Sequence, residues 1–395
     1  MVQEDSRATP LLRTLGACRQ RLDDNPDEAI QAALDEYRDV ADDLHAGREP
    51  RERSTGPSVA DLCNHFLATK EDLLNTSEIT RKTFQDYLKC CQRLVKVFGR
   101  HHLVADLTVD DFAGLRKVLS KNRCPVTVSN DIGRIRVVFN HGYDAGLLDQ
   151  PMRYGPGFKK PSRKTLRKAR QNKGERMFEA HELRQILDVL DGKPVTVDGP
   201  DGEAVEVTMK RDTILRAMVL LAANSAFGQT AVASLPQSAV DLDSGWIDYP
   251  RPKTGVPRRC PMWPETIEAL RTALAARPTP KGEADADLCF LTKYGNRWVR
   301  TSDNGASLDA VAQAFRKVLD KLNINGSRAF YALRHGFRTI ADEAKDLPAI
   351  DHIMGHVRED MASVYRERIS DERLQSVTDL VRRWLWPEDR DGSSN

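Results

Sequence analysis

Apolar residues recur every third or fourth position along most of the chain, which is the spacing of one face of an α-helix. The clearest run lies in the segment 77–99, which ends at a glycine, a natural helix stop. Thr108 and Asp111 form the acidic variant of a capping box before a shorter helix, and the segment 127–141 predicts another. With one more helical stretch near its start, the segment 57–148 is expected to form a small four-helix domain.

A second, larger domain is expected at 177–388, where helical spacing is interrupted by short strand patterns. In the segments 245–250 and 258–262 apolar and polar residues alternate, and a Pro/Gly turn joins them. The fold class predicted is mainly α with a small β-sheet, a helical domain followed by a mixed α/β domain. The helices expected in the larger domain are 178–190, 210–226, 264–276, 307–322, 331–346, 349–354, 360–366 and 371–384, and one more short strand is expected at 288–292.

Three segments lie outside these two domains. Residues 1–56 are acidic, with a helix expected at 27–45 and a polar, charged tether after it. Residues 149–176 contain several prolines and glycines and are predicted to be a linker. Residues 389–395 form a polar tail.

The composition is that of a soluble globular protein, with 40% hydrophobic and 30% charged residues among 395. No run of about 18 apolar residues is present, so no membrane-spanning helix is expected. The first ten residues lack the apolar core of a secretory signal. The seven cysteines lack the spacing of zinc or disulfide frameworks, so no metal site is predicted and a cytoplasmic location fits best.

Charge is strongly segregated, although the net charge of the chain is only +2. Residues 1–50 carry 12 acidic and 6 basic side chains, a net charge of −6, whereas residues 159–176 carry 9 basic and 1 acidic, a net charge of +8. A concentrated basic stretch in a nearly neutral chain indicates a local contact with a polyanion.

Basic side chains that lie along a nucleic-acid backbone add affinity and salt dependence without reading a sequence. A basic helical face is also a common solvated surface, so these residues support DNA binding only in combination with other signals. The candidate DNA-binding residues are Lys82, Lys89, Arg93 and Lys96 on one helix face, Arg134 and Arg136, which are expected to point outward from theirs, and Arg163, Lys164, Arg167 and Lys168 in the linker.

The most informative chemistry lies between residues 330 and 368. Arg334 opens an amphipathic helix, His356 follows a short helix, and Tyr365 comes nine residues later. A guanidinium binds two phosphate oxygens at once, an imidazole donates a hydrogen bond to the same group, and a phenol attacks phosphorus as a nucleophile. A lone tyrosine on such a helix would be packing, and it is the combination that indicates phosphoryl transfer.

This stretch resembles the tyrosine recombinase (phage integrase) family. That family carries H-x-x-R-H, then leucine or methionine with Gly-His, then a tyrosine nine residues on, and here the corresponding segments are YALRH, MGH and a tyrosine at the same distance. The resemblance implies that Tyr365 is the nucleophile that forms a 3′-phosphotyrosyl DNA intermediate. It further implies that Arg334 clamps the scissile phosphate and that His356 supports it.

A second match lies in the predicted hairpin, YPRPKTGVPRRCP. It resembles the hairpin that carries the family's lysine in a K-T-G turn, and Lys253 occupies that place. The resemblance implies that this lysine donates a proton to the leaving 5′-oxygen. A lysine ammonium can act as such a general acid when contact with the phosphate adjusts its pKa. Standing alone, a lysine in a turn would carry no functional meaning.

A third match departs from the family pattern T-G-x-R-x-x-E-L. The segment SAFGQTAVASL places Gly228 where the first phosphate-binding arginine belongs and Ala231 at the acidic position. Tyr331 also replaces the first histidine of H-x-x-R. Losing one preorganised donor commonly slows such a reaction by a factor of roughly 10²–10³.

Three explanations of Gly228 remain open from the sequence. The protein binds DNA without cutting it, another arginine substitutes, or the backbone opened by the glycine lets its amide or the Gln229 side chain meet the phosphate. The substitutes considered are Arg216, Arg258 and Arg259.

The resemblance covers about residues 57–388. It implies a helical core-binding domain that clasps DNA opposite a catalytic domain, and homo-tetramers that act on two double-stranded DNA sites. The expected function is site-specific recombination or integration, as in mobile genetic elements, without a metal, a nucleotide or another cofactor. The alternative is a recombinase-derived, sequence-specific DNA-binding protein without turnover.

Overall fold

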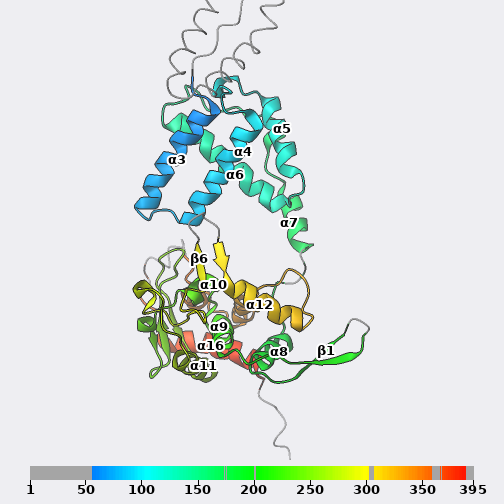
Figure 1. The fold of residues 1–395 in the computed structure, drawn as a ribbon, viewed down its shortest axis with the longest axis vertical. Helices are drawn as coiled ribbons and strands as arrows, with labels where there is room; N and C mark the ends of the chain where they lie inside the picture. Colours follow the sequence, from blue (N-terminus) through cyan, green and yellow to red (C-terminus); the bar gives the residue numbers. More distant parts are fainter. Residues whose placement is uncertain are drawn as a thin grey trace, which may run out of the picture. The chain divides into compact units, whose positions relative to one another are not determined.

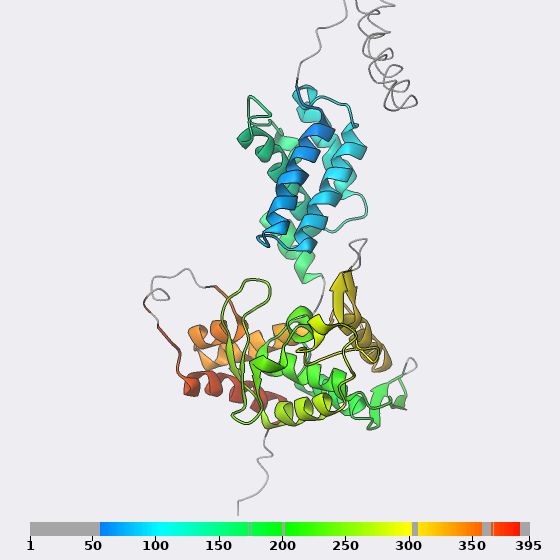
Figure 2. The same ribbon diagram turned by 60° about the vertical axis from the view of Figure 1, so that its left-hand side comes forward.

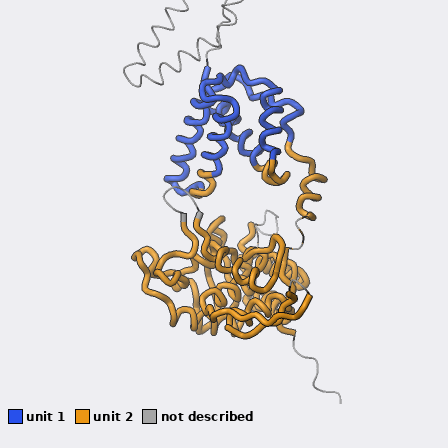
Figure 3. Tube along the Cα trace, turned by 45° about the vertical axis from the view of Figure 1, so that its right-hand side comes forward, with its two compact units in different colours: residues 1–79, 86–121, 131–159 blue, residues 80–85, 122–130, 160–395 orange. Residues whose placement is uncertain are grey.

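The computed structural model describes residues 56–172, 174, 176–199, 202–301, 307–357, 365 and 367–387. The chain divides into two compact units, which Figure 3 colours separately. The smaller unit consists of residues 1–79, 86–121 and 131–159, and the larger of residues 80–85, 122–130 and 160–395.

The smaller unit is helical. Aromatic rings form its centre: Phe112 packs edge-on against Phe98, Phe139 and Tyr154, at centroid distances of 5.6, 5.4 and 5.0 Å. Helices α3 and α4 lie side by side in both views (Figures 1 and 2). The helices are α3 (Val59–Asn75), α4 (Arg81–Phe98), α5 (Val109–Ser120) and α6 (Pro125–Asp144). The first residues of α4 and α6, 81–85 and 125–130, fall in the larger unit by this division.

Helix starts in this unit follow directly from local side-chain chemistry. The Thr108 hydroxyl accepts a hydrogen bond from the Asp111 amide, and the Asp111 carboxylate accepts one from the Thr108 amide. Ser58 and Asp61 repeat the arrangement at the start of α3. These pairs satisfy backbone donors that a helix start leaves free, so the capping box predicted at Thr108 is confirmed.

The larger unit is also mainly helical, with short antiparallel sheets. The β1–β2 hairpin extends from its side (Figure 1). Its elements are α7 (Arg163–Gln171), α8 (Ala180–Leu190), β1 (Val195–Asp198), β2 (Ala204–Val207), α9 (Thr213–Ser225), α10 (Gln229–Ala233), β3 (Val240–Asp241), β4 (Trp246–Asp248), β5 (Arg259–Pro261), α11 (Pro264–Ala275), β6 (Val299–Thr301), β7 (Ser307–Asp309), α12 (Ala310–Lys321), α13 (Ala332–Ala341), α14 (Leu347–Met354) and α16 (Asp371–Leu385).

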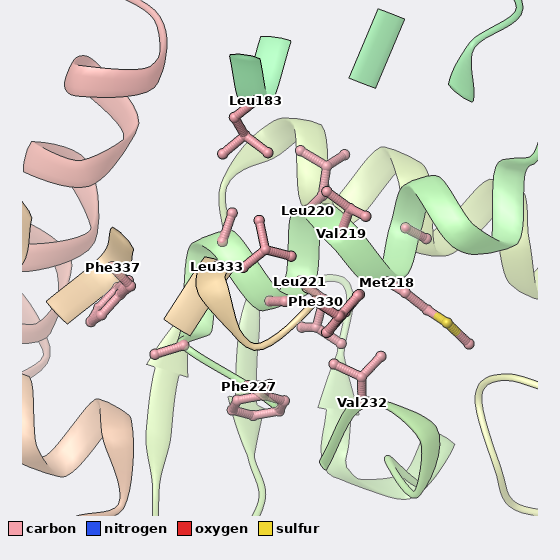
Figure 4. Close-up of a cluster of buried hydrophobic side chains, with 14 of the residues drawn as sticks. Leu183, Met218, Val219, Leu220, Leu221, Phe227, Val232, Phe330, Leu333 and Phe337 are labelled. Atoms are coloured by element: carbon pink, nitrogen blue, oxygen red, sulfur yellow. The ribbon is translucent and has the colours of Figure 1, made fainter. Parts of the chain in front are cut away.

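Helix α9 is the centre of this unit. Every residue from Ala217 to Ser225 is buried, and the helix packs against α8, α11 and α13. Figure 4 shows Leu220, Leu221 and Leu333 in one apolar cluster around it. Because the end of α9 lies inside this core, the segment that follows it is held firmly where the functional residues gather.

A small sheet with the order β3-β4-β5 borders the same region. Ile247 pairs with Cys260 in its β4–β5 ladder, and the loop between these strands carries Lys253. The side chain of Asn224 fixes the sheet to α9, since it donates to the Pro261 carbonyl at 2.9 Å and accepts from the Trp263 amide at 2.8 Å.

The predicted fold class, mainly α with a small β-sheet, is confirmed. The strand predicted at 288–292 is wrong, since only an isolated bridge joins Leu288 to Pro236 and the rest of the segment packs as buried irregular chain. The helix predicted from 307 begins at Ala310, after strand β7, because Asp309 caps it. Two elements were not predicted: the β1–β2 hairpin, and helix α7, which lies within the predicted linker.

Several predictions are not tested by the structure. The helix predicted at 27–45 lies outside the described residues, and so does the one at 360–366 except for Tyr365. The division into five segments, 1–56, 57–148, 149–176, 177–388 and 389–395, stays a prediction. No helix in the described part of the chain is long and apolar enough to cross a membrane.

Candidate active site

Arg334 is the centre of the site. It lies in the first turn of α13 and is only 4% exposed. Its Nη1 donates to the Ala226 carbonyl at 2.6 Å and its Nη2 to the Met354 carbonyl at 2.8 Å. These carbonyls stand at the ends of α9 and α14, where the partial negative charge of a helix terminus favours a cation.

Both helix ends turn through left-handed backbone. Ala226, with φ 55°, caps α9, and Gly355, with φ 64°, caps α14. This conformation ends a helix sharply and leaves its last carbonyls free to accept side-chain donors. Ala226 stands where the family pattern has a glycine, so the geometry agrees with the register that aligns Gly228 with the first arginine.

His356 pairs with Arg334 on one side and with Asp351 on the other. Its Nε2 lies 2.9 Å from Arg334 Nη2, and its Nδ1 lies 3.1 Å from Asp351 Oδ1. Because an ionised carboxylate only accepts, we assign the proton of the neutral ring to Nδ1, so that Nε2 accepts from the guanidinium. Burial lowers the pKa of His356 below its ordinary 6.5, and the charges of Arg334 and Arg251 act in the same direction against the effect of Asp351.

Two further arginines come from the β4–β5 hairpin. Arg251 Nη1 donates to the Gly355 carbonyl at 3.2 Å. Arg258 is 3% exposed, its Nε donates to the Tyr249 carbonyl at 2.9 Å, and its guanidinium lies 3.9 Å from the centroid of the Phe227 ring. Burial, and then the charge of Arg334, lowers the pKa of Arg258 to about 10.

The hairpin tip and the tyrosine are exposed. Lys253 lies in the turn that the amides of Thr254 and Gly255 close onto the Arg251 carbonyl. Tyr365 is 77% exposed, so its hydroxyl is accessible rather than packed into the core. Among the described residues no hydrogen bond joins either side chain to Arg334 or His356. The structure thus assembles the arginine and the histidine and leaves the lysine and the tyrosine at the surface.

Of the substitutes considered for the missing first arginine, only Arg258 lies at this site. Arg216 forms an ion pair with Asp191 at 2.9 Å. Arg259 pairs with Asp371 at 2.9 Å and also with Asp248. Two of the three arginines are therefore already neutralised by carboxylates.

Gly228 is the N-cap residue of α10 and faces Tyr331. Tyr331 is 42% exposed, and its phenol lies close enough to Arg334 to raise the pKa of the guanidinium, against the larger lowering effect of burial. Ala231, at the acidic position of the pattern, is buried.

The candidate DNA-binding residues fall into two groups. Lys82, Lys89 and Lys96 on α4 are exposed, and seven-residue steps place them on one face. The basic residues of α7, a helix with no buried residue, are exposed as well: Arg163, Lys164, Arg167 and Lys168.

Three arginines of the smaller unit are instead engaged within it. Arg93 forms an ion pair with Asp131 at 2.9 Å, and Arg134 forms one with Asp86 at 2.7 Å. Arg136 donates to the Phe158 carbonyl at 3.0 Å. The expectation that Arg134 and Arg136 point outward is therefore corrected: both are half-buried, because packed helices bring acidic and carbonyl partners within their reach.

Sequence reasoning missed two members of the site, Arg251 and Asp351. Arg251 stands two residues before Lys253 in the hairpin segment. Asp351 stands one helical turn before the Gly-His pair, so both lie close to residues that the motifs identify. Among the described residues, no group of three or more His, Cys, Asp or Glu side chains could hold a metal ion.

Comparison with known proteins identifies a family for the larger unit. Residues 203–371 match the model of the phage integrase family. No curated protein sequence shows significant similarity to the chain.

Solved structures share the fold at low sequence identity. A lambda integrase tetramer bound to a Holliday junction matches with a TM-score of 0.54 and 14% identity, over 87% of this chain and 88% of that one. The Tn1549 transposon integrase (residues 82–397) in complex with circular intermediate DNA matches with a TM-score of 0.53 and 13% identity, over 81% of this chain and 98% of that one.

Proposed function

Since this chain belongs to the phage integrase family of tyrosine recombinases, we propose that it is a site-specific DNA recombinase that cuts and rejoins DNA through a phosphotyrosyl intermediate at Tyr365. The observation that carries the proposal is the contact between buried Arg334 and half-buried His356 at 2.9 Å, where two helix ends meet. Such a preorganised donor group is suited to a phosphate oxygen and has little purpose in an ordinary core.

The proposed reaction is a transesterification at one backbone phosphate. The Tyr365 hydroxyl gives up its proton to solvent as its oxygen attacks phosphorus and a P–O(tyrosine) bond forms. The bond from phosphorus to the 5′-oxygen breaks, and Lys253 gives a proton to that oxygen. One phosphodiester replaces another, so the bond energy is kept for rejoining. In the second half the 5′-hydroxyl of a partner strand attacks the adduct and releases the tyrosine.

Arg334 holds the non-bridging oxygens, where the transition state gains negative charge. His356 can donate to the same phosphate once its Nε2 carries a proton, and the negative charge of the bound phosphate favours that protonation. Asp351 keeps the ring oriented from the far side. Tyr365 must move toward this group from its exposed position, which a solvent-exposed side chain is free to do.

The partner is double-stranded DNA in this proposal. The exposed lysines of α4 and the basic face of α7 are positioned to contact phosphates, so affinity should fall steeply as salt rises. The lambda integrase match is a tetramer bound to a Holliday junction, and we extend a tetramer on two DNA sites to this chain. Within the larger unit, α16 packs on α13 and α14 of its own chain.

One observation favours the alternative, a recombinase-derived protein that binds DNA without cutting it. Gly228 offers no side chain at the position of the first arginine, and such a loss commonly slows the reaction by roughly 10²–10³. Both functions predict DNA binding, and only the recombinase predicts a covalent complex.

The test is a covalent trap. The full chain is incubated with nicked duplexes of varied core sequence, in which the 5′-hydroxyl fragment diffuses away after cleavage and leaves the adduct stranded. We expect a protein–DNA adduct that survives denaturation, and none with Tyr365→Phe, although that variant binds the same DNA. Binding without any adduct, across duplexes that the protein recognises, would leave the DNA-binding alternative in place.

A further inference from the structure

The cluster around Arg334 holds more positive charge than its neighbours neutralise. Arg251, Arg258 and Arg334 donate to backbone carbonyls, and no carboxylate of the described residues pairs with any of them. Asp351, the nearest acidic partner in the hydrogen-bond network, is bonded to His356. Charges of one sign gathered in a partly buried site repel one another, unless an anion joins them.

Arg251 and Arg334 bind neighbouring carbonyls at the end of α14. Arg251 Nη1 binds the carbonyl of Gly355, and Arg334 binds the carbonyl of Met354, the preceding residue of the same helix end. The two guanidinium groups are close enough that Arg251 lowers the pKa of Arg334 and also that of His356. Arg251 is half-buried, so it still reaches solvent from this position.

Arg258 holds the backbone that leads into Arg251. It donates to the carbonyls of Tyr249 and Pro250, the two residues that lead into Arg251. Its own Nη1 is buried and has no hydrogen-bond partner among the described residues. The Arg258 guanidinium lies over the Phe227 ring, adds positive charge to the cluster, and fixes the carbonyls of the two residues that precede Arg251.

We propose that Arg251 is the second phosphate-binding arginine of this site and takes the role that the family pattern gives to position 228. The side chain comes from the hairpin rather than from the start of α10, and approaches the phosphate from the face that also carries Lys253. The inference rests on the proposed function, and it adds a catalytic residue that the family motifs do not contain.

The first experiment is the rate of adduct formation on a nicked substrate under single-turnover conditions. Arg251→Ala should slow the rate by roughly 10²–10³, as expected for the loss of one preorganised donor, with DNA affinity changed far less. Arg259→Ala is the matched control, because this arginine lies on the same hairpin and pairs with Asp248 and Asp371 instead. An Arg251→Ala rate within a few fold of the unsubstituted protein overturns the inference.

The second experiment does not depend on cleavage. Inorganic phosphate, compared with chloride at equal ionic strength, should raise the melting temperature of the unsubstituted protein and of Arg259→Ala, and should lose that effect in Arg251→Ala. If the unsubstituted protein forms no adduct, the proposed function fails, while phosphate stabilisation that depends on Arg251 still supports this anion site. Phosphate stabilisation that persists in Arg251→Ala, or is absent from the unsubstituted protein, overturns it.

Discussion

The ring of Tyr331 covers Gly228: a Cβ on residue 228 would come within 3.3 Å of both Cδ2 and Cε2 of the ring. These are two of the positions at which the chain departs from the family pattern, where an arginine and a histidine are expected. The two departures are in contact, so the tyrosine occupies space that an arginine stem at 228 would need.

Restoring the first arginine should therefore require both positions. In an Arg251→Ala background, Gly228→Arg alone should leave the adduct rate low, because the Tyr331 ring obstructs the new side chain. Gly228→Arg combined with Tyr331→His should recover about tenfold or more of the lost rate. The measurement is single-turnover adduct formation, and equal rates for the single and the double substitution would contradict the coupling.

Gly355 should not tolerate a side chain. Its φ is +64°, and an added Cβ would meet Arg258 Cδ at 2.7 Å and Arg251 Cβ at 2.9 Å. Gly355→Ala should cost about 1–2 kcal/mol of folding free energy from the left-handed backbone alone, and should displace both arginines and slow cleavage.

The matched control for Gly355 is Gly202→Ala. Its φ is +77° but no atom lies within 4 Å of the added Cβ, so the backbone strain is similar and the clash is absent. Urea denaturation gives the stability of both variants. Equal adduct rates for the two variants would show that the predicted clash of a residue-355 side chain with Arg251 and Arg258 does not affect cleavage.

Asn224 should contribute strongly to the folding stability of the larger unit. It is fully buried, and its removal leaves the Pro261 carbonyl and the Trp263 amide without their partner. Asn224→Ala should lower the free energy of unfolding by about 2–4 kcal/mol. Asn296, whose side chain donates to the Tyr294 carbonyl at 3.4 Å in an exposed bond, provides the comparison: Asn296→Ala should cost much less, and equal losses in urea denaturation would refute the argument.

Stability should decline on mild acidification. Burial holds the pKa values of His335, His352 and His356 below the ordinary 6.5. The unfolded chain then binds protons at a higher pH than the folded chain, so the free energy of unfolding falls as pH drops below about 6.5 and levels off below the lowered folded pKa values. Melting temperatures measured from about pH 7 to pH 5 should fall, and His352→Gln should flatten the profile. A rise in stability over that interval would contradict this assignment.

The parts of the fold that the sequence revealed are those with local, periodic signals. The apolar run that forms α9 and the capping box at Thr108 depend on residues within a turn or two of one another, and both were predicted. The β1–β2 hairpin was missed although the sequence GPDGE separates Val195–Asp198 from Ala204–Val207, because each strand has only four residues.

The same distinction holds within the site. Arg334 and His356 could be identified because they lie in segments, YALRH and MGH, that resemble the motifs of a known family. Arg251 could not be identified from the sequence, because it joins the site through a hydrogen bond to the carbonyl of Gly355, 104 residues away. A turn residue has no periodicity, and only the folded chain shows which helix end it reaches.

The central claim is that Tyr365 becomes linked to DNA, and peptide mapping of the trapped complex tests it most directly. After protease and nuclease digestion, mass spectrometry should find a nucleotide 3′-phosphate remnant on the peptide that contains Tyr365, and on no other peptide. A remnant on a different residue, or a stable DNA complex that yields no modified peptide, would contradict the account.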